Sequence, residues 1–146
     1  MKAVVQKVSS AKVTIDNKIY SEIRSGLLVF IAFNYSDDFN KIKWMVNKLV
    51  NLRVFPDDED KMNKSVLDNN GSILLVSNFT LYGNALKGFR PSFIEAAPPE
   101  ISEPLYLQML KYMNENYPIK VESGIFGAMM EIELINNGPV TIIIEK

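Results

Sequence analysis

Hydrophobic and polar residues alternate near both ends of the chain, and uninterrupted apolar runs lie between them. Alternation is typical of strands with one buried face, and short apolar runs are typical of strands buried on both faces. Asp16-Asn17 predicts a hairpin turn between two of these strands. The predicted strands are residues 1–8, 12–15, 18–23, 27–33, 72–77, 119–122, 126–135 and 139–145.

Two other segments carry apolar residues at helical spacing. The first helix is predicted over 39–52, with Ser36 as its N-cap and Asp37 and Asp38 in its first turn, where the helix dipole favours anions. The second helix is predicted over 102–116. The inward residues are expected to be Phe39, Ile42, Met45, Val46, Leu49 and Val50 in the first helix, and Leu105, Met109, Leu110 and Met113 in the second.

With residues 1–8 and 12–15 counted together, the order of elements is two strands, two strand–helix units and three further strands. Two helices are too few to cover both faces of one large sheet, so we predict an α/β fold of two or three layers. Residues 1–146 contain no repeat or linker and are expected to form a single domain.

Composition narrows the possible chemistry. The net charge is −1, so no broad basic surface for nucleic acid is expected. The chain has no Cys and no His, which excludes thiol nucleophiles, Ser-His-Asp catalysis and Cys- or His-ligated zinc. The acidic run 56–60 lacks the spacing of a calcium loop and is interpreted as a solvated loop. No metal or cofactor is expected. No apolar run is long enough to span a membrane, and the first residues lack a signal-peptide core.

The sequence Asn136-Asn137-Gly138-Pro139 separates the last two predicted strands. Asn and Gly tolerate the positive φ of tight turns, so the simplest interpretation is a hairpin whose second strand begins with Pro139. The alternative is that Gly138 and Pro139 present backbone to a ligand, because glycine permits close approach and proline fixes the backbone direction.

Three other stretches carry candidate chemistry, each with an ordinary alternative. Ser77–Leu81 gathers hydroxyls, an amide and backbone N–H groups at the carboxyl end of a buried strand, where α/β proteins tend to place ligands. Otherwise it is a plain strand end. Lys87–Phe93 interleaves cations with aromatic rings, which suits a phosphate and a stacked base. Otherwise it is a surface loop. Phe126, Ala128 and Met130 would share one strand face and are expected in the core.

Together these motifs resemble the D-aminoacyl-tRNA deacylase family, also called D-tyrosyl-tRNA deacylases. The resemblance covers essentially the whole chain and rests on residues 1–8, 77–81, 87–93, 124–130 and 137–141. It implies an α/β homodimer with its sites at the subunit interface. It also implies hydrolysis of the ester that joins a D-amino acid, or glycine, to the 3′-terminal adenosine of tRNA. A cytoplasmic location is expected, because tRNA is charged there.

The resemblance assigns roles to individual residues. In the family, the Gly-Pro pair is cis and reaches from one subunit into the site of the other. A rigid wall of backbone carbonyls would exclude an L side chain by its position and would let glycine through. The implied roles are hydrolysis for Ser77, Asn78, Phe79 and Thr80, substrate binding and chiral filtering for Lys7, Phe126, Met130, Gly138 and Pro139, and tRNA contact for Lys87 and Arg90.

Two mechanisms remain open. In one, Thr80 attacks the ester carbonyl. In the other, the ribose 2′-hydroxyl of the substrate helps activate water, and backbone N–H groups including that of Phe79 stabilise the carbonyl oxygen. The second is favoured because Thr80 has no evident general base.

The chain departs from the family pattern at three positions. Asn78 stands where glutamine is usual, Lys7 where arginine is usual and Asn137 where aspartate is usual. The shorter amide and the loss of the planar guanidinium are expected to slow turnover or loosen chiral selection.

There are two alternatives to an enzyme: a non-catalytic relative that binds tRNA 3′ ends, and a dimeric interaction protein. Measurement of turnover would separate the enzyme from both alternatives.

Overall fold

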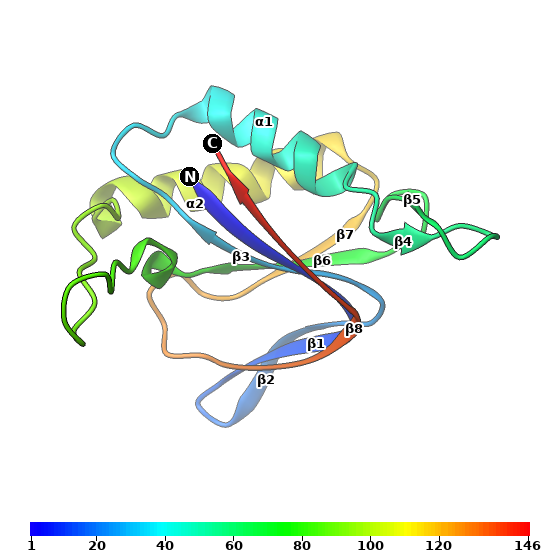
Figure 1. The fold of residues 1–146 in the computed structure, drawn as a ribbon, viewed down its shortest axis with the longest axis horizontal. Helices are drawn as coiled ribbons and strands as arrows, with labels where there is room; N and C mark the ends of the chain where they lie inside the picture. Colours follow the sequence, from blue (N-terminus) through cyan, green and yellow to red (C-terminus); the bar gives the residue numbers. More distant parts are fainter.

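The computed structural model describes residues 1–146 and contains a curved sheet with two long helices on one side of it (Figure 1). The elements in chain order are β1 (Lys2–Ile15), β2 (Lys18–Ile23), β3 (Gly26–Ala32), α1 (Phe39–Val50), β4 (Phe55–Pro56), β5 (Met62–Lys64), β6 (Ser72–Ser77), the 3₁₀ helix η1 (Phe79–Tyr82), α2 (Pro99–Asn116), β7 (Lys120–Ser123) and β8 (Glu131–Glu145).

Strand β1 is the centre of the sheet, because it pairs with three other strands. Along one edge it pairs with β8 from Lys2 to Thr14. Its other edge is divided between β3, which pairs with the first half, and β2, which pairs with the second half. The strand order is β2-β1-β3-β6-β7, with β8 joined to β1. The pairs β3–β6 and β6–β7 are parallel and the others in this sheet are antiparallel, so the sheet is mixed.

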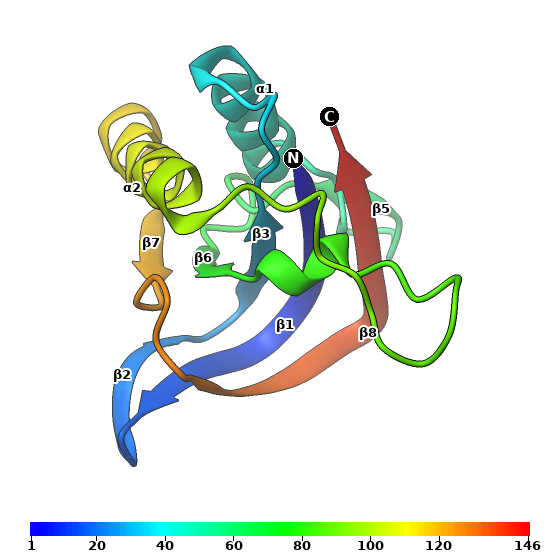
Figure 2. The ribbon, with the colours of Figure 1, turned by 90° about the vertical axis from the view of Figure 1, so that its left-hand side faces the viewer.

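The main core lies between the sheet and the two helices, which cover the same face (Figure 2). Strands β3 and β6 contribute alternate residues to it, and each helix contributes one apolar stripe. Its fully buried large side chains include Leu27, Ile31, Ile42, Met45, Leu49, Ile73, Leu75, Tyr106 and Met109.

A second, smaller core lies on the opposite face of β3 and β6. The sheet curls there, so that β2 and the adjoining halves of β1 and β8 fold over Leu28, Leu74 and Val76 (Figure 2). The hydroxyl of Ser21 on β2 donates to the carbonyl of Ser123 at the end of β7, 2.8 Å away. Both faces of β3 and β6 are therefore buried, which explains their uninterrupted apolar sequences.

These observations confirm the layered α/β fold and most of the predicted elements. The strands at 27–33 and 72–77 correspond to β3 and β6, and the Asp16-Asn17 turn joins β1 to β2. The two segments 1–8 and 12–15 form one continuous strand. The prediction missed the short hairpin of β4 and β5, which flanks the acidic run 56–60.

The first helix begins at residue 39 as predicted, but its predicted N-cap and the predicted beginning of the second helix were wrong by a few residues. The N-cap of α1 is Asp38, whose carboxylate accepts from Lys41 N at 2.9 Å, whereas Ser36 lies in the preceding turn. Asp37 is outside the helix and its carboxylate binds the amino group of Met1 at 2.8 Å. Helix α2 begins at Pro99 rather than at residue 102, because proline suits the first helical position, where no N–H partner is needed.

The C-terminal third departs most from prediction. Residues 126–130 of the predicted strand 126–135 belong to no strand, and its remaining residues join the predicted strand 139–145 in one strand, β8. Gly127 has φ +74°, a conformation that interrupts extended backbone. No hairpin forms at Asn136–Pro139, because both halves of β8 pair with the same neighbour, β1.

Candidate functional site

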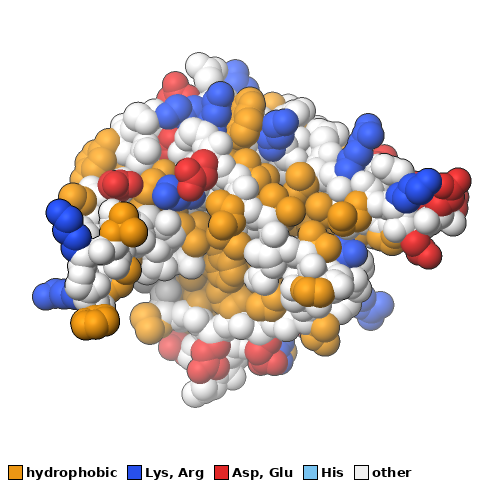
Figure 3. All heavy atoms as spheres, viewed as in Figure 1, with side chains coloured by type: hydrophobic (Ala, Val, Ile, Leu, Met, Phe, Trp, Pro, Cys, Tyr) orange, Lys and Arg blue, Asp and Glu red, His pale blue; other side chains and the backbone are white.

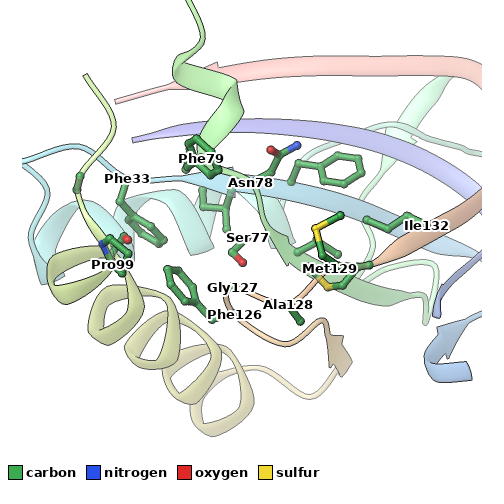
Figure 4. Close-up of a pocket in the computed structure, with 17 residues that line it drawn as sticks. Phe33, Ser77, Asn78, Phe79, Pro99, Phe126, Gly127, Ala128, Met129 and Ile132 are labelled. Carbon is green, nitrogen blue, oxygen red and sulfur yellow. The ribbon is translucent and has the colours of Figure 1, made fainter. Parts of the chain in front are cut away.

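A cleft of about 470 Å³ opens at the carboxyl ends of the parallel strands β3 and β6 (Figure 4). The last residues of β3 and β6, the start of η1, the start of α2 and segment 126–130 surround it. Most of its lining is apolar. Ser77, Asn78 and Ser102 are the only polar side chains in that lining, and none of its side chains carries a charge. The cleft therefore suits a neutral organic group rather than a phosphate or a metal ion.

The cleft exists because β7 stops pairing before β6 ends. The last pair between these strands is Leu75 with Ser123, whereas β6 continues to Ser77 beside Ile31 of β3. The chain after Ser123 diverges from β6 and forms the opposite wall. Figure 4 shows Ser77 and Phe79 on one side of the cleft and Phe126 and Gly127 on the other.

The turn after β6 is held by the side chain of Asn78. Its carbonyl oxygen accepts from the backbone N–H of Thr80 at 3.2 Å and also from the Thr80 hydroxyl. Asn78 is thus the N-cap of η1, a 3₁₀ helix that the sequence analysis did not predict. Phe79 is the first residue of η1, so its N–H has no acceptor within that helix.

Thr80 adjoins the cleft but does not line it. Its side chain is exposed, and the only side chain with which it forms a hydrogen bond is Asn78. An amide oxygen is not a base at neutral pH, so nothing in contact with Thr80 would take its proton. The structure therefore places Ser77, Asn78 and Phe79 at the cleft and leaves Thr80 behind them.

Segment 124–130 brings two further predicted residues, Phe126 and Met130, into the lining. The expectation that they share a strand face was wrong, but both lie at the cleft. The Phe126 ring packs against Tyr106 of α2 with centroids 5.9 Å apart. Met130 packs over Gly124, where a Cβ atom would lie 2.5 Å from the Met130 sulfur.

Gly138 and Pro139 lie in a bulge of β8, outside this cleft. Between the pairs Gln6–Thr141 and Val8–Asn136, β1 contributes one residue, Lys7, while β8 contributes residues 137–140. The Asn136 side-chain amide closes the bulge by donating to the carbonyls of Lys7 and Val140, each at 3.0 Å. The Gly138–Pro139 peptide is cis, and both residues are exposed.

The remaining predicted residues lie away from the cleft. The Lys7 side chain is half-buried and forms no hydrogen bond or ion pair within the chain. Lys7 contacts the bulge through its backbone carbonyl, which accepts from Asn136. Lys87 and Arg90 lie on an exposed loop that is closed at its base by hydrogen bonds between Asn84 and Ser92. That loop is joined to the cleft by an edge-to-face contact between Phe93 and Phe79, with centroids 5.2 Å apart.

Sequence reasoning missed part of the lining. Phe33, Ala97, Pro99 and Ser102 reach the cleft from the end of β3 and the start of α2. The only sequence signal for them was their position beside the end of a predicted central strand or the start of a predicted helix.

No cluster of three or more Asp or Glu side chains with metal-binding geometry occurs in the protein. No helix is both long and apolar enough to cross a membrane.

Comparison with known proteins identifies relatives along the whole chain. The family model described as D-Tyr-tRNA(Tyr) deacylase matches residues 4–145. A D-aminoacyl-tRNA deacylase of Fusobacterium nucleatum is 49% identical over 145 residues, which cover 99% of this chain and 95% of the relative. The D-aminoacyl-tRNA deacylase of Petrotoga mobilis is also 49% identical, over 100% of this chain and 97% of the relative.

Solved structures with the same fold agree with these relatives. One, described as c-Myc DNA Unwinding Element Binding Protein, superposes with a TM-score of 0.95 at 40% identity and covers 100% of this chain and 99% of that chain. Another, described as a probable eukaryotic D-amino acid tRNA deacylase, has a TM-score of 0.82 at 18% identity over 98% of this chain and 97% of that chain, and shows the fold alone. The chain therefore belongs to the D-Tyr-tRNA(Tyr) deacylase family.

Proposed function

We propose that this protein hydrolyses the ester bond of D-aminoacyl-tRNA, and of mischarged glycyl-tRNA, and releases the amino acid and free tRNA. The observation that carries this proposal is the uncharged cleft beside the unpaired N–H of Phe79. A 3′-terminal aminoacyl-ribose is uncharged at its ester, and an apolar cleft with a few polar groups suits it. Family membership supports the same reaction.

The proposed chemistry uses backbone and substrate rather than an acidic or basic side chain. The Phe79 N–H donates to the ester carbonyl oxygen and stabilises the negative charge that develops when water attacks the carbonyl carbon. The 2′-hydroxyl of the terminal ribose helps activate that water by accepting its proton while it passes its own proton to the departing 3′-oxygen. The ester C–O bond then breaks, and the 3′-oxygen of tRNA takes up a proton. Ser77 and Asn78 supply hydrogen bonds at the cleft.

The proposed filter for chirality is the Gly138–Pro139 backbone of a second subunit. This pair lies outside the cleft of its own chain and is exposed, as a segment that reaches into a neighbour must be. Backbone carbonyls present a wall that side-chain rotation cannot relax. Lys7, opposite the bulge, supports it from β1. Such a wall rejects an L side chain, accepts a D side chain and has nothing to exclude in glycine.

Exposed apolar side chains of β8 support a homodimer. Ile135 is 63% exposed and Ile143 is 69% exposed, before and after the Gly138–Pro139 bulge and on opposite faces of the strand. In Figure 3, hydrophobic side chains gather across the middle of the face on which β1 and β8 lie, while charged ones lie around its edges and at the tip near β4 and β5. An apolar patch next to the filter suits a second copy of this chain.

The loop that carries Lys87 and Arg90 is proposed to contact the tRNA. It projects beside η1 (Figure 2), and the contact between Phe93 and Phe79 fixes its base near the cleft. Phe89 at its tip is fully exposed, so its ring is free to stack on an unpaired base of the tRNA 3′ end. Lys87 and Arg90 on either side of that ring would contact phosphates.

The first test is deacylation of D-Tyr-tRNA, with L-Tyr-tRNA as its control. We expect rapid loss of the D ester and a stable L ester. Gly138→Ala would place a Cβ atom 2.9 Å from the Val140 nitrogen, so it should distort the wall and reduce the ratio of D to L hydrolysis. If folded wild-type protein hydrolyses neither substrate but binds the tRNA 3′ end, the non-catalytic alternative is correct.

The role of the second subunit needs a separate measurement. Light scattering should give the mass of two chains. A mixture of Gly138→Ala chains with chains carrying a blocked cleft, such as Ala128→Trp, should recover D-selective activity, because one site in each mixed dimer has both parts intact. A monomeric but D-selective protein would remove the cross-subunit filter and leave the hydrolytic assignment intact.

A further inference from the structure

Strands β6 and β7 part at a defined point, which we call the fork, formed by Leu75, Ser123 and Gly124. The Gly124 N–H makes the last contact across it, donating to the Leu75 carbonyl at 3.1 Å. Beyond the fork, β6 forms one side of the cleft and segment 124–130 forms the other. The width of the cleft therefore depends on how the two backbones are held at this point.

Tyr106 of helix α2 lies directly at the fork. Its hydroxyl is 2.9 Å from the Leu75 carbonyl oxygen and 3.3 Å from that of Gly124, so a single O–H group faces the backbones of both branches. The residue is only 1% exposed. Burial raises the pKa of the Tyr106 phenol, so the hydroxyl stays a donor throughout the physiological range.

The fork is also held from the opposite face of the sheet. There the buried Ser21 hydroxyl of β2 donates to the Ser123 carbonyl. This contact ends at residue 123, and the next carbonyl, that of Gly124, has no hydrogen-bond donor other than Tyr106. The Tyr106 hydroxyl is therefore the donor that holds the Gly124 carbonyl, while the Leu75 carbonyl holds the N–H of the same residue.

The ring of Tyr106 contacts the same wall. It packs against Phe126, which lines the cleft, whereas Tyr106 itself does not line it. Further along, Met130 folds back over Gly124. The wall is thus a short loop whose first residue is held at its N–H by Leu75 and at its carbonyl by the Tyr106 hydroxyl, and whose aromatic side chain, Phe126, packs on the Tyr106 ring.

We infer that Tyr106 is a positioning residue that sets the width of the cleft and thereby its affinity for the aminoacyl-adenosine end of the substrate. It acts through Gly124 and Phe126 and not through contact with the ligand. Removal of its hydroxyl leaves the buried Gly124 carbonyl without a hydrogen-bond donor. Segment 124–130 then shifts to a position in which this carbonyl has another donor. The identity of the ligand rests on the proposed function, but the control of the wall by Tyr106 does not.

The test compares Tyr106→Phe, which removes one oxygen, with Val66→Ala, which trims a fully buried core residue that does not line the cleft. The probe is a non-hydrolysable D-aminoacyl-adenosine amide. We expect its Kd and the KM for D-Tyr-tRNA to rise about tenfold in Tyr106→Phe, with kcat within about twofold, the size expected for loss of one buried hydrogen bond. Val66→Ala should lower the thermal midpoint without changing Kd or KM.

Hydrogen exchange provides a readout that needs no ligand. The amides of residues 124–130 should exchange faster in Tyr106→Phe than in Val66→Ala at equal global stability. Unchanged exchange in this segment would overturn the inference, whatever the protein hydrolyses. Faster exchange with unchanged Kd would overturn the link between the wall and affinity. If the wild type neither binds the amide nor hydrolyses D-Tyr-tRNA, the proposed function fails, and the exchange experiment still decides the role of Tyr106.

Discussion

The side-chain carbonyl of Asn78 accepts hydrogen bonds from both the backbone N–H and the hydroxyl of Thr80. A hydroxyl that donates to an amide keeps its proton, because the amide has no useful basicity. The same two bonds fix the first turn of η1 and so the direction of the Phe79 N–H. This arrangement separates the structural role of the Asn78–Thr80 pair from any role of Thr80 in the chemical step.

Replacement of Thr80 by valine tests this separation. The variant keeps the shape of the side chain and loses the hydroxyl, so we expect single-turnover hydrolysis of D-Tyr-tRNA to fall by less than about tenfold, the effect of a loosened turn. Removal of a true nucleophile costs on the order of 10⁶-fold in serine proteases. Thr80→Ser, which retains the hydroxyl, is the control. A folded Thr80→Val protein that is inactive beside an active Thr80→Ser protein would make the hydroxyl the nucleophile.

Asn78 offers a second prediction, because its cap can be removed or retained. Asn78→Ala should cost about 1 kcal/mol of stability, as loss of an N-cap does, and should lower kcat about ten- to a hundredfold by misplacing the Phe79 N–H. Asn78→Asp keeps an acceptor at the same position and should retain the stability. Urea unfolding and single-turnover rates measure the two effects. Equal rates for Asn78→Ala and wild type would dissociate the cap from catalysis.

The sequence predicted the strands that are buried on both faces. Segments 27–33 and 72–77 are apolar throughout because β3 and β6 are buried on both faces, and this feature is visible without any partner strand. The hairpin predicted at Asn136–Pro139 from turn preferences does not form. Its residues favour a hairpin locally, but eleven residue pairs with β1 hold β8 as one strand, and such long-range pairing outweighs a local preference.

The site was predictable in part for a similar reason. The position of Ser77, Asn78 and Phe79 at the cleft could be predicted because they lie at the carboxyl end of a buried strand, where clefts of α/β proteins occur. Tyr106 was not found, because in the sequence it is one aromatic residue on an apolar helix face. Its importance comes from two carbonyls located 31 and 18 residues away along the chain. Local patterns contain no information on contacts of that kind.

Asp37 provides a prediction for stability. Its carboxylate is fully buried and binds the Met1 ammonium at 2.8 Å, the Asn34 N–H at 2.8 Å and the Lys41 ammonium at 3.3 Å. Asp37→Asn would leave the buried ammonium of Met1 without a counter-charge, which costs about 3 kcal/mol or more. Chemical denaturation should therefore show a large fall in the unfolding free energy.

The matched control for Asp37→Asn is Asp58→Asn. Asp58 also pairs with a lysine, Lys64 at 2.8 Å, but its side chain is 97% exposed. Solvent screens this pair, so the substitution should leave the denaturation midpoint unchanged. Similar losses in the two variants would show that the Met1–Asp37 contact contributes no more than a surface ion pair.

The last prediction concerns alkaline pH and Tyr82, the last residue of η1. Burial, followed by the nearby charge of Asp37, raises the pKa of the Tyr82 phenol to about 12. In the unfolded chain the pKa of a tyrosine is about 10. Below pH 10 both states are protonated, so the contribution of this phenol to stability is fully present. Above pH 10 the unfolded state releases its proton first, so stability falls as pH rises towards 12.

Lysines also lose their protons in that range, so the comparison must isolate the phenol. Tyr82→Phe keeps the ring and removes the titrating group. The difference in unfolding free energy between wild type and Tyr82→Phe should be constant between pH 8 and pH 9.5, as measured by urea denaturation. It should then shift steadily against the wild type up to pH 11.5, because only the wild type retains a buried proton that its unfolded state has lost. A difference that stays constant over the whole range would show that Tyr82 ionises equally easily in the folded protein, and that the end of η1 is open to solvent.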